Sequence, residues 1–494
     1  MQLFPSFEEF KRYAADAGVV PVWREFLFDV DTAVTAYAKL AEPPFGFLLE
    51  SVVGGEQWAR YSFLGTKPSG AWRLRDGKVS WWTPESGWQD VATSDPLGDL
   101  DARLRARRPA HVPGLPRLWG GAVGYFGYDV VRLIERLPTP RMDDLGIPDG
   151  LFVFTDVVLA IDNLKGRAMA IAAVPIDQGA DLRKAYDAAA ARTEAVVNKL
   201  AAAPAPPPLA LKPEPKEDPP FTSSSTRAEF EAAVERIREY IRAGDAFQVV
   251  ISQRFGMELR ASPFDLYRAL RSLNPSPYLY FLELDGLTLV GSSPEVLVRL
   301  EDGIVTVRPI AGSRRRGGTP EEDRALAAEL LADEKELAEH RMLVDLGRND
   351  VGRVAEYGSV HVPDLVVIER YSHIMHLVSQ VEGKLKPGLS AIDAFRACFP
   401  AGTVSGAPKI RAMEIINELE PVKRCTYAGA VGHFGWGGAS MDTAITIRTV
   451  AVTGGRAYVQ AGAGIVLDSD PATEYEESLT KARALLRAAA MVGR

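Results

Sequence analysis

Residues 333–340 read Asp-Glu-Lys-Glu-Leu-Ala-Glu-His, and residues 471–477 read Pro-Ala-Thr-Glu-Tyr-Glu-Glu. Both runs are predicted to be helical, and each places two glutamates three residues apart on one helix face. The pairs are Glu336 with Glu339 and Glu474 with Glu477. This spacing is also common on solvated helices. If the two faces meet, four carboxylates form the thiol-free oxygen set that Mg²⁺ prefers.

Several ordered motifs surround these runs. In the C-terminal part they are residues 309–314, 342–350, 372–379 and 400–409, and in the N-terminal part they are residues 48–51, 60–63 and 120–125. Over about residues 221–490 the motifs resemble those of the chorismate-utilising enzymes. The N-terminal motifs are most similar to the branch of that family that aminates chorismate to give anthranilate and pyruvate, the first committed step of tryptophan biosynthesis.

The resemblance implies an α+β fold, in which two antiparallel sheets pack as a sandwich with outer helices and the active site lies in the cleft. The chain divides at a linker, residues 204–222, which has 8 prolines between positions 204 and 220 and no apolar periodicity. Residues 1–203 are expected to be a regulatory, tryptophan-binding portion. Residues 223–494 are expected to be the chorismate-binding catalytic portion.

Hydrophobic periodicity and capping residues predict the main elements of the catalytic portion. Helices are predicted from Thr226 to Ile241, from an N-cap at Thr319 to about Leu343, and from Asp470 onward. Strands are predicted over residues 247–255, 278–283, 288–291, 296–300, 428–434, 441–452 and 457–463.

The resemblance gives the acidic residues separate roles. Glu339 and Glu477 would bind Mg²⁺ directly, and Glu336 with Glu474 would hold its water ligands. The metal would assist displacement of the ring hydroxyl as a Lewis acid. Glu295 would be the general acid that protonates the leaving hydroxide.

A second proton transfer is needed when pyruvate is eliminated and the ring becomes aromatic. His376 is the candidate for it, with His373 close by in sequence, because histidine exchanges protons near neutral pH.

Chorismate carries two carboxylates that need hydrogen-bond donors. Arg448 can form a bidentate fork to one of them, backbone N–H groups of a glycine-containing run can approach an anion, and hydroxyls can donate from Thr403 and Tyr427. The residues that the resemblance places around the substrate are Gln248, Ala311, Gly312, Ser313, Thr403, Tyr427, Arg448, Gly462, Ala463 and Gly464.

Two of these positions separate sister activities. Relatives that add water to chorismate have a lysine where this chain has Gln248, which cannot act as a base. Relatives that make 4-amino-4-deoxychorismate have a nucleophilic lysine where this chain has Ala311. Ser313 replaces the threonine usual in the family and keeps the hydroxyl. These residues favour direct attack of ammonia at C2 of chorismate.

Two further segments match the tryptophan-binding elements of the family. Glu50 would pair with the amino group of L-tryptophan, and apolar neighbours would receive the indole. The residues are Leu49, Glu50, Ser51, Asn274, Pro275, Ser276, Pro277 and Tyr278. Feedback inhibition by tryptophan is therefore expected.

Composition restricts the partners. A net charge of −8 argues against sequence-independent nucleic-acid binding, and no apolar run reaches the roughly 18 residues of a membrane span. The two cysteines, Cys398 and Cys425, form no CxxC pair, which fits a reducing cytoplasm. Neither lies in a nucleophile motif, so the chain is expected to use ammonia itself and glutamine only through a separate amidotransferase subunit. The resemblance implies a heterotetramer of two large and two small subunits.

Three other functions stay open. An enzyme that stops after amination would release 2-amino-2-deoxyisochorismate, and a sister enzyme would make 4-amino-4-deoxychorismate. A catalytically silent sensor of chorismate or tryptophan would need neither Glu295 nor His376.

Overall fold

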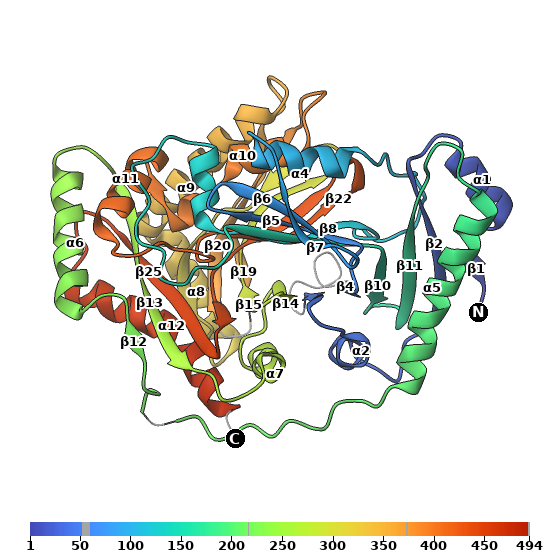
Figure 1. Ribbon diagram of the computed structural model, residues 1–494. Helices are drawn as coiled ribbons and strands as arrows, with labels where there is room; N and C mark the ends of the chain where they lie inside the picture. Colours follow the sequence, from blue (N-terminus) through green and yellow to red (C-terminus); the bar gives the residue numbers. More distant parts are fainter. Residues whose placement is uncertain (52–59, 216, 372–373, 493–494) are drawn as a thin grey trace.

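The computed structural model describes residues 1–51, 60–215, 217–371 and 374–492. Within these residues two large antiparallel sheets, of 13 and 12 strands, form the body of the molecule, and helices cover it from outside (Figure 1). This arrangement confirms the predicted α+β sandwich.

The first sheet runs through both halves of the chain. Its strand order is β1 (Leu3–Phe4), β2 (Val19–Leu27), β11 (Arg167–Pro175), β10 (Val157–Asp162), β4 (Tyr61–Thr66), β3 (Phe45–Glu50), β14 (Tyr278–Leu284), β15 (Leu287–Ser293), β24 (Thr449–Thr453), β25 (Arg456–Ile465), β13 (Gln248–Glu258) and β12 (Thr222–Ser223), with β21 (Gly406–Ala407) on β13.

The second sheet also runs through both halves of the chain. Its order is β18 (Ile310–Arg315), β20 (Ile374–Lys384), β17 (Ile304–Val307), β16 (Val296–Glu301), β23 (Met441–Ile445), β22 (Ala430–Gly435), β8 (Gly121–Phe126), β9 (Gly150–Thr155), β5 (Gly70–Arg75), β6 (Lys78–Thr83) and β7 (Gly87–Val91), with β19 (His361–Arg370) on β20.

Helices pack on the outer faces of both sheets. They are α1 (Phe7–Ala14), α2 (Ala33–Leu40), α4 (Pro96–Arg105), α5 (Leu182–Ala202), α6 (Arg227–Arg242), α7 (Pro263–Leu273), α8 (Pro320–Ala332), α9 (Glu334–Val354), α10 (Ala391–Cys398), α11 (Lys409–Leu419) and α12 (Pro471–Met491), with short 3₁₀ turns η1 (Tyr128–Leu133), η2 (Gly402–Val404) and η3 (Trp436–Gly438). In the described part of the chain, none of the helices is both long and apolar enough to cross a membrane.

The two portions on either side of the linker share both sheets. β3 pairs with β14 in the first sheet, and β8 pairs with β22 in the second. Between α5 and β12 the linker follows the outside of the molecule as an extended chain (Figure 1). The linker therefore separates two parts of the sequence whose backbones are hydrogen-bonded into common sheets.

The sandwich interior is filled by side chains from both sheets. Tyr280 and Leu289 of the first sheet lie in one apolar cluster with Tyr125 and Val431 of the second. All four are almost fully buried. Burying each such side chain stabilises the fold by about 1.5–3 kcal/mol.

The chain passes from one sheet to the other at two adjacent crossings. β15 leads into β16 through Pro294 and Glu295, and β23 leads into β24 through residues 446–448. The prediction of one strand over residues 441–452 is therefore wrong. Arg448 has φ +51°, a left-handed conformation that breaks the strand. The crossings are joined where Ile445 N–H donates to Glu295 O at 3.0 Å and Ser292 N–H donates to Arg448 O at 3.1 Å.

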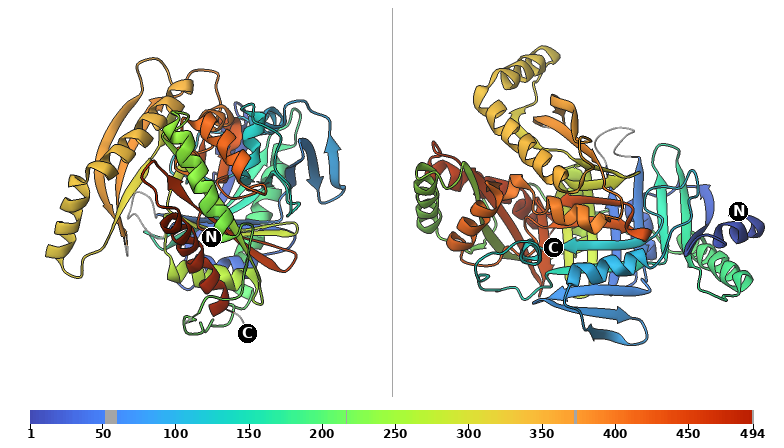
Figure 2. Two further views of the ribbon diagram at one scale, coloured as in Figure 1. Left: turned by 90° about the vertical axis from the view of Figure 1, so that its left-hand side faces the viewer. Right: turned by 90° about the horizontal axis from the view of Figure 1, so that it is seen from above.

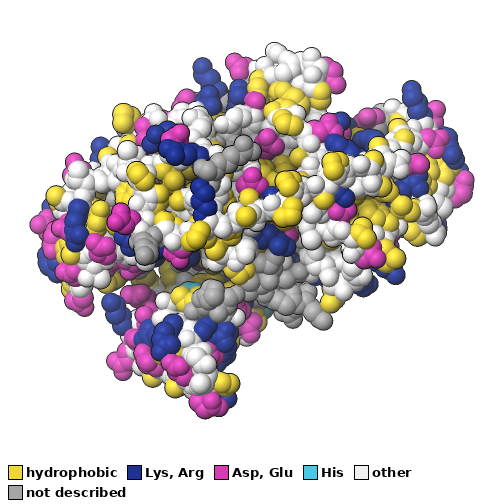
Figure 3. Space-filling view, turned by 90° about the horizontal axis from the view of Figure 1, so that it is seen from below, with side chains coloured by type: hydrophobic (Ala, Val, Ile, Leu, Met, Phe, Trp, Pro, Cys, Tyr) yellow, Lys and Arg dark blue, Asp and Glu magenta, His cyan; other side chains and the backbone are white. Residues whose placement is uncertain are grey.

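The prediction of one helix from Thr319 to Leu343 is also wrong. Asp333 has extended backbone dihedrals, so it ends α8 and caps α9, and its side chain accepts from Lys335 N–H and Glu336 N–H. The break arises because an aspartate N-cap competes with helix continuation. Helix α8, the start of α9 and strands β18 to β20 form a lobe that projects from the body (Figure 2), and a hollow separates this lobe from the body in the view from below (Figure 3).

Candidate active site

Glu295 lies at the first sheet crossing with its side chain buried at 7 % exposure. The Thr403 hydroxyl donates to its carboxylate at 2.9 Å. Burial raises the pKa of Glu295 to about 8, and the hydrogen bonds from Thr403 and from the Ile310 backbone oppose the rise. Glu295 is therefore largely protonated at neutral pH, which is the state that a general acid requires.

His376 lies in β20 and is oriented by a bulge in the neighbouring strand β18. Gly312 has φ +62° in this bulge, and its carbonyl oxygen is 2.9 Å from His376 Nδ1. Because a carbonyl can only accept, Nδ1 carries the proton and Nε2 presents a lone pair. Burial lowers the pKa of His376, and the charge of Arg448 lowers it further. A neutral imidazole can act as a base. Its sequence neighbour His373 lies outside the described residues.

The other residues of β18 lie close to this pair. Ser313 is opposite His376 in the β18–β20 pairing, and Ala311 is opposite Leu377. A Cβ atom at Gly312 would lie 3.0 Å from Glu336 Oε2. The bulge thus brings the predicted substrate and metal residues together.

Arg448 occupies the second sheet crossing. Burial lowers the pKa of Arg448, and no carboxylate among the described residues lies close enough to offset that effect. Burying a guanidinium without a carboxylate partner costs free energy, and an anionic ligand would offset part of that cost. Arg448 is thus placed to bind a substrate carboxylate.

The run Gly462 to Gly464 lies in β25, beside Gln248 of β13. A Cβ atom at Gly464 would lie 2.8 Å from Gln248 Nε2, so a larger residue there would displace this amide. The pairing of β25 with β24 ends at Val459. Beyond Val459 the backbone of β25 is no longer paired with β24. Backbone groups around Ala463 are therefore available to a ligand.

The four glutamates approach one another from α9 and α12 without forming one ligand set. In the described residues no three acidic, histidine or cysteine side chains are placed to hold a metal ion together. Glu336 is 3.5 Å from Arg314, and Glu477 is 2.7 Å from Lys481. Burial raises the pKa of Glu339, and the charges of Glu336, Glu474 and Glu477 raise it further. Lys335, Arg314 and Lys481 offset only part of this mutual repulsion, and a divalent cation would remove more of it.

A buried hydrogen-bond network behind the site was not predicted from the sequence. The carboxylate of Glu420 accepts from Ser252 N–H at 2.8 Å and from Arg424 Nε at 2.9 Å. Arg424, fully buried, also donates to the carbonyls of Val404 at 2.7 Å and Val250 at 2.6 Å. Its guanidinium therefore ties the turn that carries Thr403 to strand β13. The only sequence signal was an acidic and a basic residue four apart, in a segment that contains other charged residues.

Tyr427 lies next to this network. Its ring is 5.5 Å from the Arg424 guanidinium, and burial raises its pKa to about 12. The phenol is therefore protonated at neutral pH and can act as a hydrogen-bond donor.

A cavity lies between the two sheets, where the portion of the chain before the linker meets the portion after it. Its volume is about 510 Å³, and its lining includes Leu49, Glu50, Ser51, Pro277 and Tyr278. Five of the eight residues predicted to bind tryptophan thus meet at one cavity.

The other three predicted residues support the cavity from behind. Asn274 Nδ2 donates to Ser292 Oγ at 3.1 Å, and Ser276 Oγ donates to Ser292 O at 3.2 Å. Pro275 lies between them in the sequence. This loop is thus held to the end of β15, three residues before Glu295.

Glu50 is already engaged within the protein. Its side chain is 2 % exposed and accepts from Arg271 Nε at 3.0 Å and from the Tyr267 hydroxyl at 2.5 Å. Another carboxylate borders the cavity, since Asp442 accepts from the Tyr278 hydroxyl at 2.9 Å and pairs with Arg299 at 2.8 Å. An amino group bound here would meet Asp442 as well as Glu50.

Glu295 thus lies at one sheet crossing and Arg448, without a carboxylate partner among the described residues, lies at the other, close enough to His376 to lower its pKa. The family model for chorismate binding enzymes matches residues 53–487, and the chain belongs to that family.

Individual relatives agree over the full length. Anthranilate synthase component 1 of Pseudomonas aeruginosa is 52% identical over 490 residues, with 98% of each chain covered. The crystal structure of anthranilate synthase component I from Streptococcus pneumoniae is 40% identical, with a TM-score of 0.78 over 93% of this chain and 99% of that one. The menaquinone-specific isochorismate synthase of Escherichia coli, 17% identical with a TM-score of 0.69 over 98% of this chain and 99% of that one, shares the fold.

Proposed function

We propose that this chain converts chorismate and ammonia to anthranilate, pyruvate and water. The observation that carries the proposal is Glu295, a buried carboxyl with a pKa of about 8 that faces the same site as His376 and Arg448. Full-length relatives named anthranilate synthase component 1 support the choice of product.

In the first half-reaction, ammonia forms a bond to C2 of the ring while the bond from C4 to its hydroxyl oxygen breaks. Glu295 gives its proton to that oxygen, so water leaves. Arg448 holds a substrate carboxylate, and Thr403 keeps the carboxyl of Glu295 in place. Gln248 has no basic group, which suits a nucleophile that needs no deprotonation before attack.

In the second half-reaction the enolpyruvyl group leaves and the ring becomes aromatic. The bond from C3 to the ether oxygen breaks, the C2 proton is removed, and a proton reaches the enolpyruvyl methylene carbon. Nε2 of His376, with Nδ1–H held by Gly312 O, is the group that takes the C2 proton.

We further propose that Glu336, Glu339, Glu474 and Glu477 hold Mg²⁺ once substrate is bound. The bound ion would withdraw charge from the ring carboxylate and orient it. The raised pKa of Glu339 supports this assignment. Closure of the α8–α9 lobe on the body would bring the four carboxylates together.

We propose that L-tryptophan binds the cavity of about 510 Å³ and inhibits the enzyme. Its indole would lie against Leu49 and Pro277. A separate amidotransferase subunit would supply ammonia from glutamine, as the name "component 1" of the relatives suggests.

The test is to mix the purified protein with chorismate, Mg²⁺ and an ammonium salt, and to follow anthranilate fluorescence with product masses. Fluorescent anthranilate that requires Mg²⁺ and falls with tryptophan is the expected result. An aminated product that keeps its enolpyruvyl group would reassign the chain to an amination-only function, and no conversion of chorismate would favour the sensor. Glutamine-dependent turnover by the single chain would overturn the need for a second subunit.

A further inference from the structure

A small cavity lies directly behind the elements that carry the substrate-binding residues. Tyr427 lines it, together with Thr446 and Thr449 on either side of the Arg448 crossing and Gln460 two residues before Gly462. It has room, about 10 Å³, for the centre of one water-sized molecule. A single buried water needs a space of roughly 10–15 Å³, so the cavity is at the lower limit for one water.

Two buried oxygens in the lining lack hydrogen bonds. Thr446 Oγ1, on a fully buried side chain, and Gln460 Oε1, on a side chain that is 8 % exposed, have no partner among the described residues. The Gln460 amide nitrogen donates to Ser252 Oγ at 2.9 Å, which leaves its oxygen for the cavity. Buried polar atoms without partners are rare because each one costs free energy.

The charges of the lining restrict what could satisfy these atoms. Arg254 and Arg424 both line the cavity, and no carboxylate does. Both guanidinium groups are already paired, Arg424 with Glu420 and Arg254 with Asp144, so the lining offers a cation no carboxylate of its own. An anion the size of a carboxylate exceeds the space. Only a small neutral molecule fits both limits.

We propose that this cavity is a binding site for one neutral molecule the size of water that donates a hydrogen bond to Gln460 Oε1 and shares another with Thr446 Oγ1. Solvent water and the ammonia co-substrate have this same chemistry. The ammonia reading rests on the proposed function.

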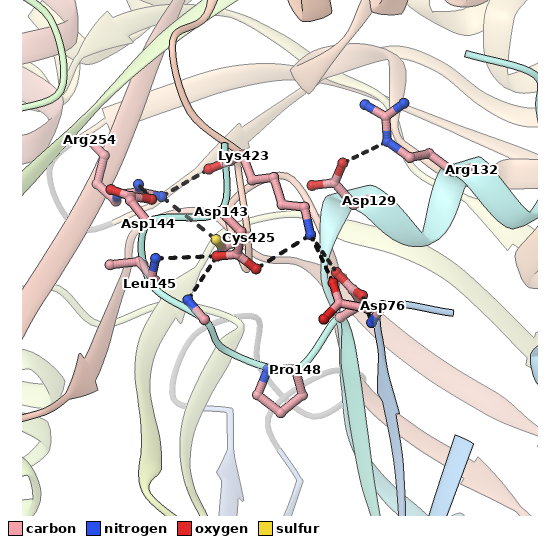
Figure 4. Close-up of polar contacts among 12 residues, drawn as sticks. Asp76, Asp129, Arg132, Asp143, Asp144, Leu145, Pro148, Arg254, Lys423 and Cys425 are labelled. Atoms are coloured by element: carbon pink, nitrogen blue, oxygen red, sulfur yellow. Dashed lines mark hydrogen bonds and ion pairs between the residues drawn. The ribbon is translucent and has the colours of Figure 1, made fainter. Parts of the chain in front are cut away.

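One wall of the cavity adjoins a cluster of charged residues. Leu145, Arg254 and Cys425 form this wall, and Figure 4 shows Arg254 directed between Asp144 and the Lys423 carbonyl, with Cys425 beside it. The wall is held by Asp143, which accepts from Leu145 N–H at 3.2 Å and Gly146 N–H at 2.8 Å.

Outside this wall lie further carboxylates. Asp76, Asp143 and Asp149 surround Lys423 at 3.7, 3.4 and 3.8 Å (Figure 4). Acidic groups raise the local concentration of ammonium, whereas the cavity lining has no carboxylate that would bind the charged form. The cavity therefore stands between an acidic surface and Tyr427 of the active site.

The direct test is a high-resolution crystal structure of the full chain and of its Thr446→Val variant. The expected result is a density peak within hydrogen-bond distance of Gln460 Oε1 and Thr446 Oγ1 that disappears in the variant, since valine keeps the shape and removes the hydroxyl. An empty cavity in the unmodified protein, or a peak that persists unchanged in the variant, would overturn the site.

Steady-state kinetics identify the occupant. If ammonia uses the site, Thr446→Val raises the KM for ammonium about three- to ten-fold, the effect of one lost hydrogen bond, with the KM for chorismate unchanged. If the occupant is water, the density peak is lost and the KM for ammonium is unchanged. Ala451→Val, which fills the cavity from β24, should reproduce either result.

Thr443→Val is the matched control. Thr443 lies in β23, three residues before Thr446, is equally buried, and donates to Val298 O at 2.9 Å. It does not line the cavity, so its loss should leave both the density peak and the KM for ammonium unaltered. If the unmodified protein makes no anthranilate, the proposed function fails, yet the crystal structures still decide whether the site exists.

Discussion

At the scale of single residues, the burial of Glu295 links catalysis to pH. Because the carboxyl must be protonated to act as an acid, turnover should fall as pH rises through its pKa of about 8. Thr403→Val removes a hydrogen bond that favours the charged form, so the pKa of Glu295 should rise and the alkaline limb of the rate profile should move to higher pH. Profiles of kcat for both proteins test this, and an unmoved or lowered limb would contradict it.

The same residue predicts a change in stability. The folded pKa of Glu295 is raised above its usual 4.5, so ionisation opposes folding, and stability is lost as pH rises from about that value through about 8. Glu295→Gln stays neutral. It should lower kcat by about 10²–10⁴-fold, yet its Tm relative to the unmodified protein should increase between pH 5 and pH 9. A Tm difference that is constant with pH would show that Glu295 ionises freely in the folded protein.

At the scale of elements, the turn η2 is held by one guanidinium. Lysine has one nitrogen in place of the three of the guanidinium fork and cannot reach acceptors that lie this far apart, so Arg424→Lys should release either Val404 or Val250 and loosen Thr403. We expect kcat to fall about ten- to a hundred-fold, and the alkaline limb to shift in the same direction as in Thr403→Val. The kcat of the double variant, Arg424→Lys with Thr403→Val, should be no lower than that of the slower single variant, because both substitutions act through one contact.

The control for Arg424→Lys is Arg103→Lys in α4. Arg103 also pairs with an acid, Asp99, at 2.8 Å and stacks on an aromatic ring, Trp81, at 4.2 Å, but it lies outside the site. Its kcat and pH profile should be unchanged. Additive losses of kcat in Arg424→Lys combined with Thr403→Val would contradict the positioning role.

The elements also show what sequence can and cannot predict. Strands such as β13 and β25 were predicted because each contains a short apolar run, such as residues 249–251 in β13. The second sheet crossing, at Arg448, was missed because a left-handed residue inside an apolar run does not interrupt the apolar pattern. The break at Asp333 was missed because both flanking segments favour helix.

The candidate site also contains residues that the sequence can predict and residues that it cannot. Glu295, His376 and Arg448 could be proposed because motifs carry them, and the structure brings them together. Arg424 and Glu420 could not, because their role depends on contacts with Ser252 and Val404, which are distant in sequence. The carboxyl of Glu50 was expected to face a ligand, but its contacts with Arg271 and Tyr267 come from α7, which sequence did not place beside β3.

At the scale of the whole molecule, the shared sheets connect the cavity proposed for tryptophan to the candidate active site. The cavity is lined by β3 of one portion and by β14 of the other, and Tyr278 of β14 is opposite Ser293 of β15, two residues before Glu295. A ligand that binds one arrangement of these strands better than another shifts their population by its difference in affinity. Ser292, held by Asn274 and Ser276, is where the cavity loop and the acid-bearing crossing meet.

Ser292→Ala removes the hydroxyl that joins the two elements. We expect tryptophan to bind the variant in the absence of chorismate about as well as it binds the unmodified protein. The factor by which tryptophan weakens chorismate binding should fall about two- to ten-fold, the effect of one hydrogen bond. By linkage, the factor by which chorismate weakens tryptophan binding must fall equally, and calorimetric titrations in both orders measure both factors. Thr288→Ala, at the other end of β15, should leave both factors unchanged. A weaker affinity for tryptophan alone, with undiminished coupling, would place Ser292 in the ligand site and not on the route between the sites.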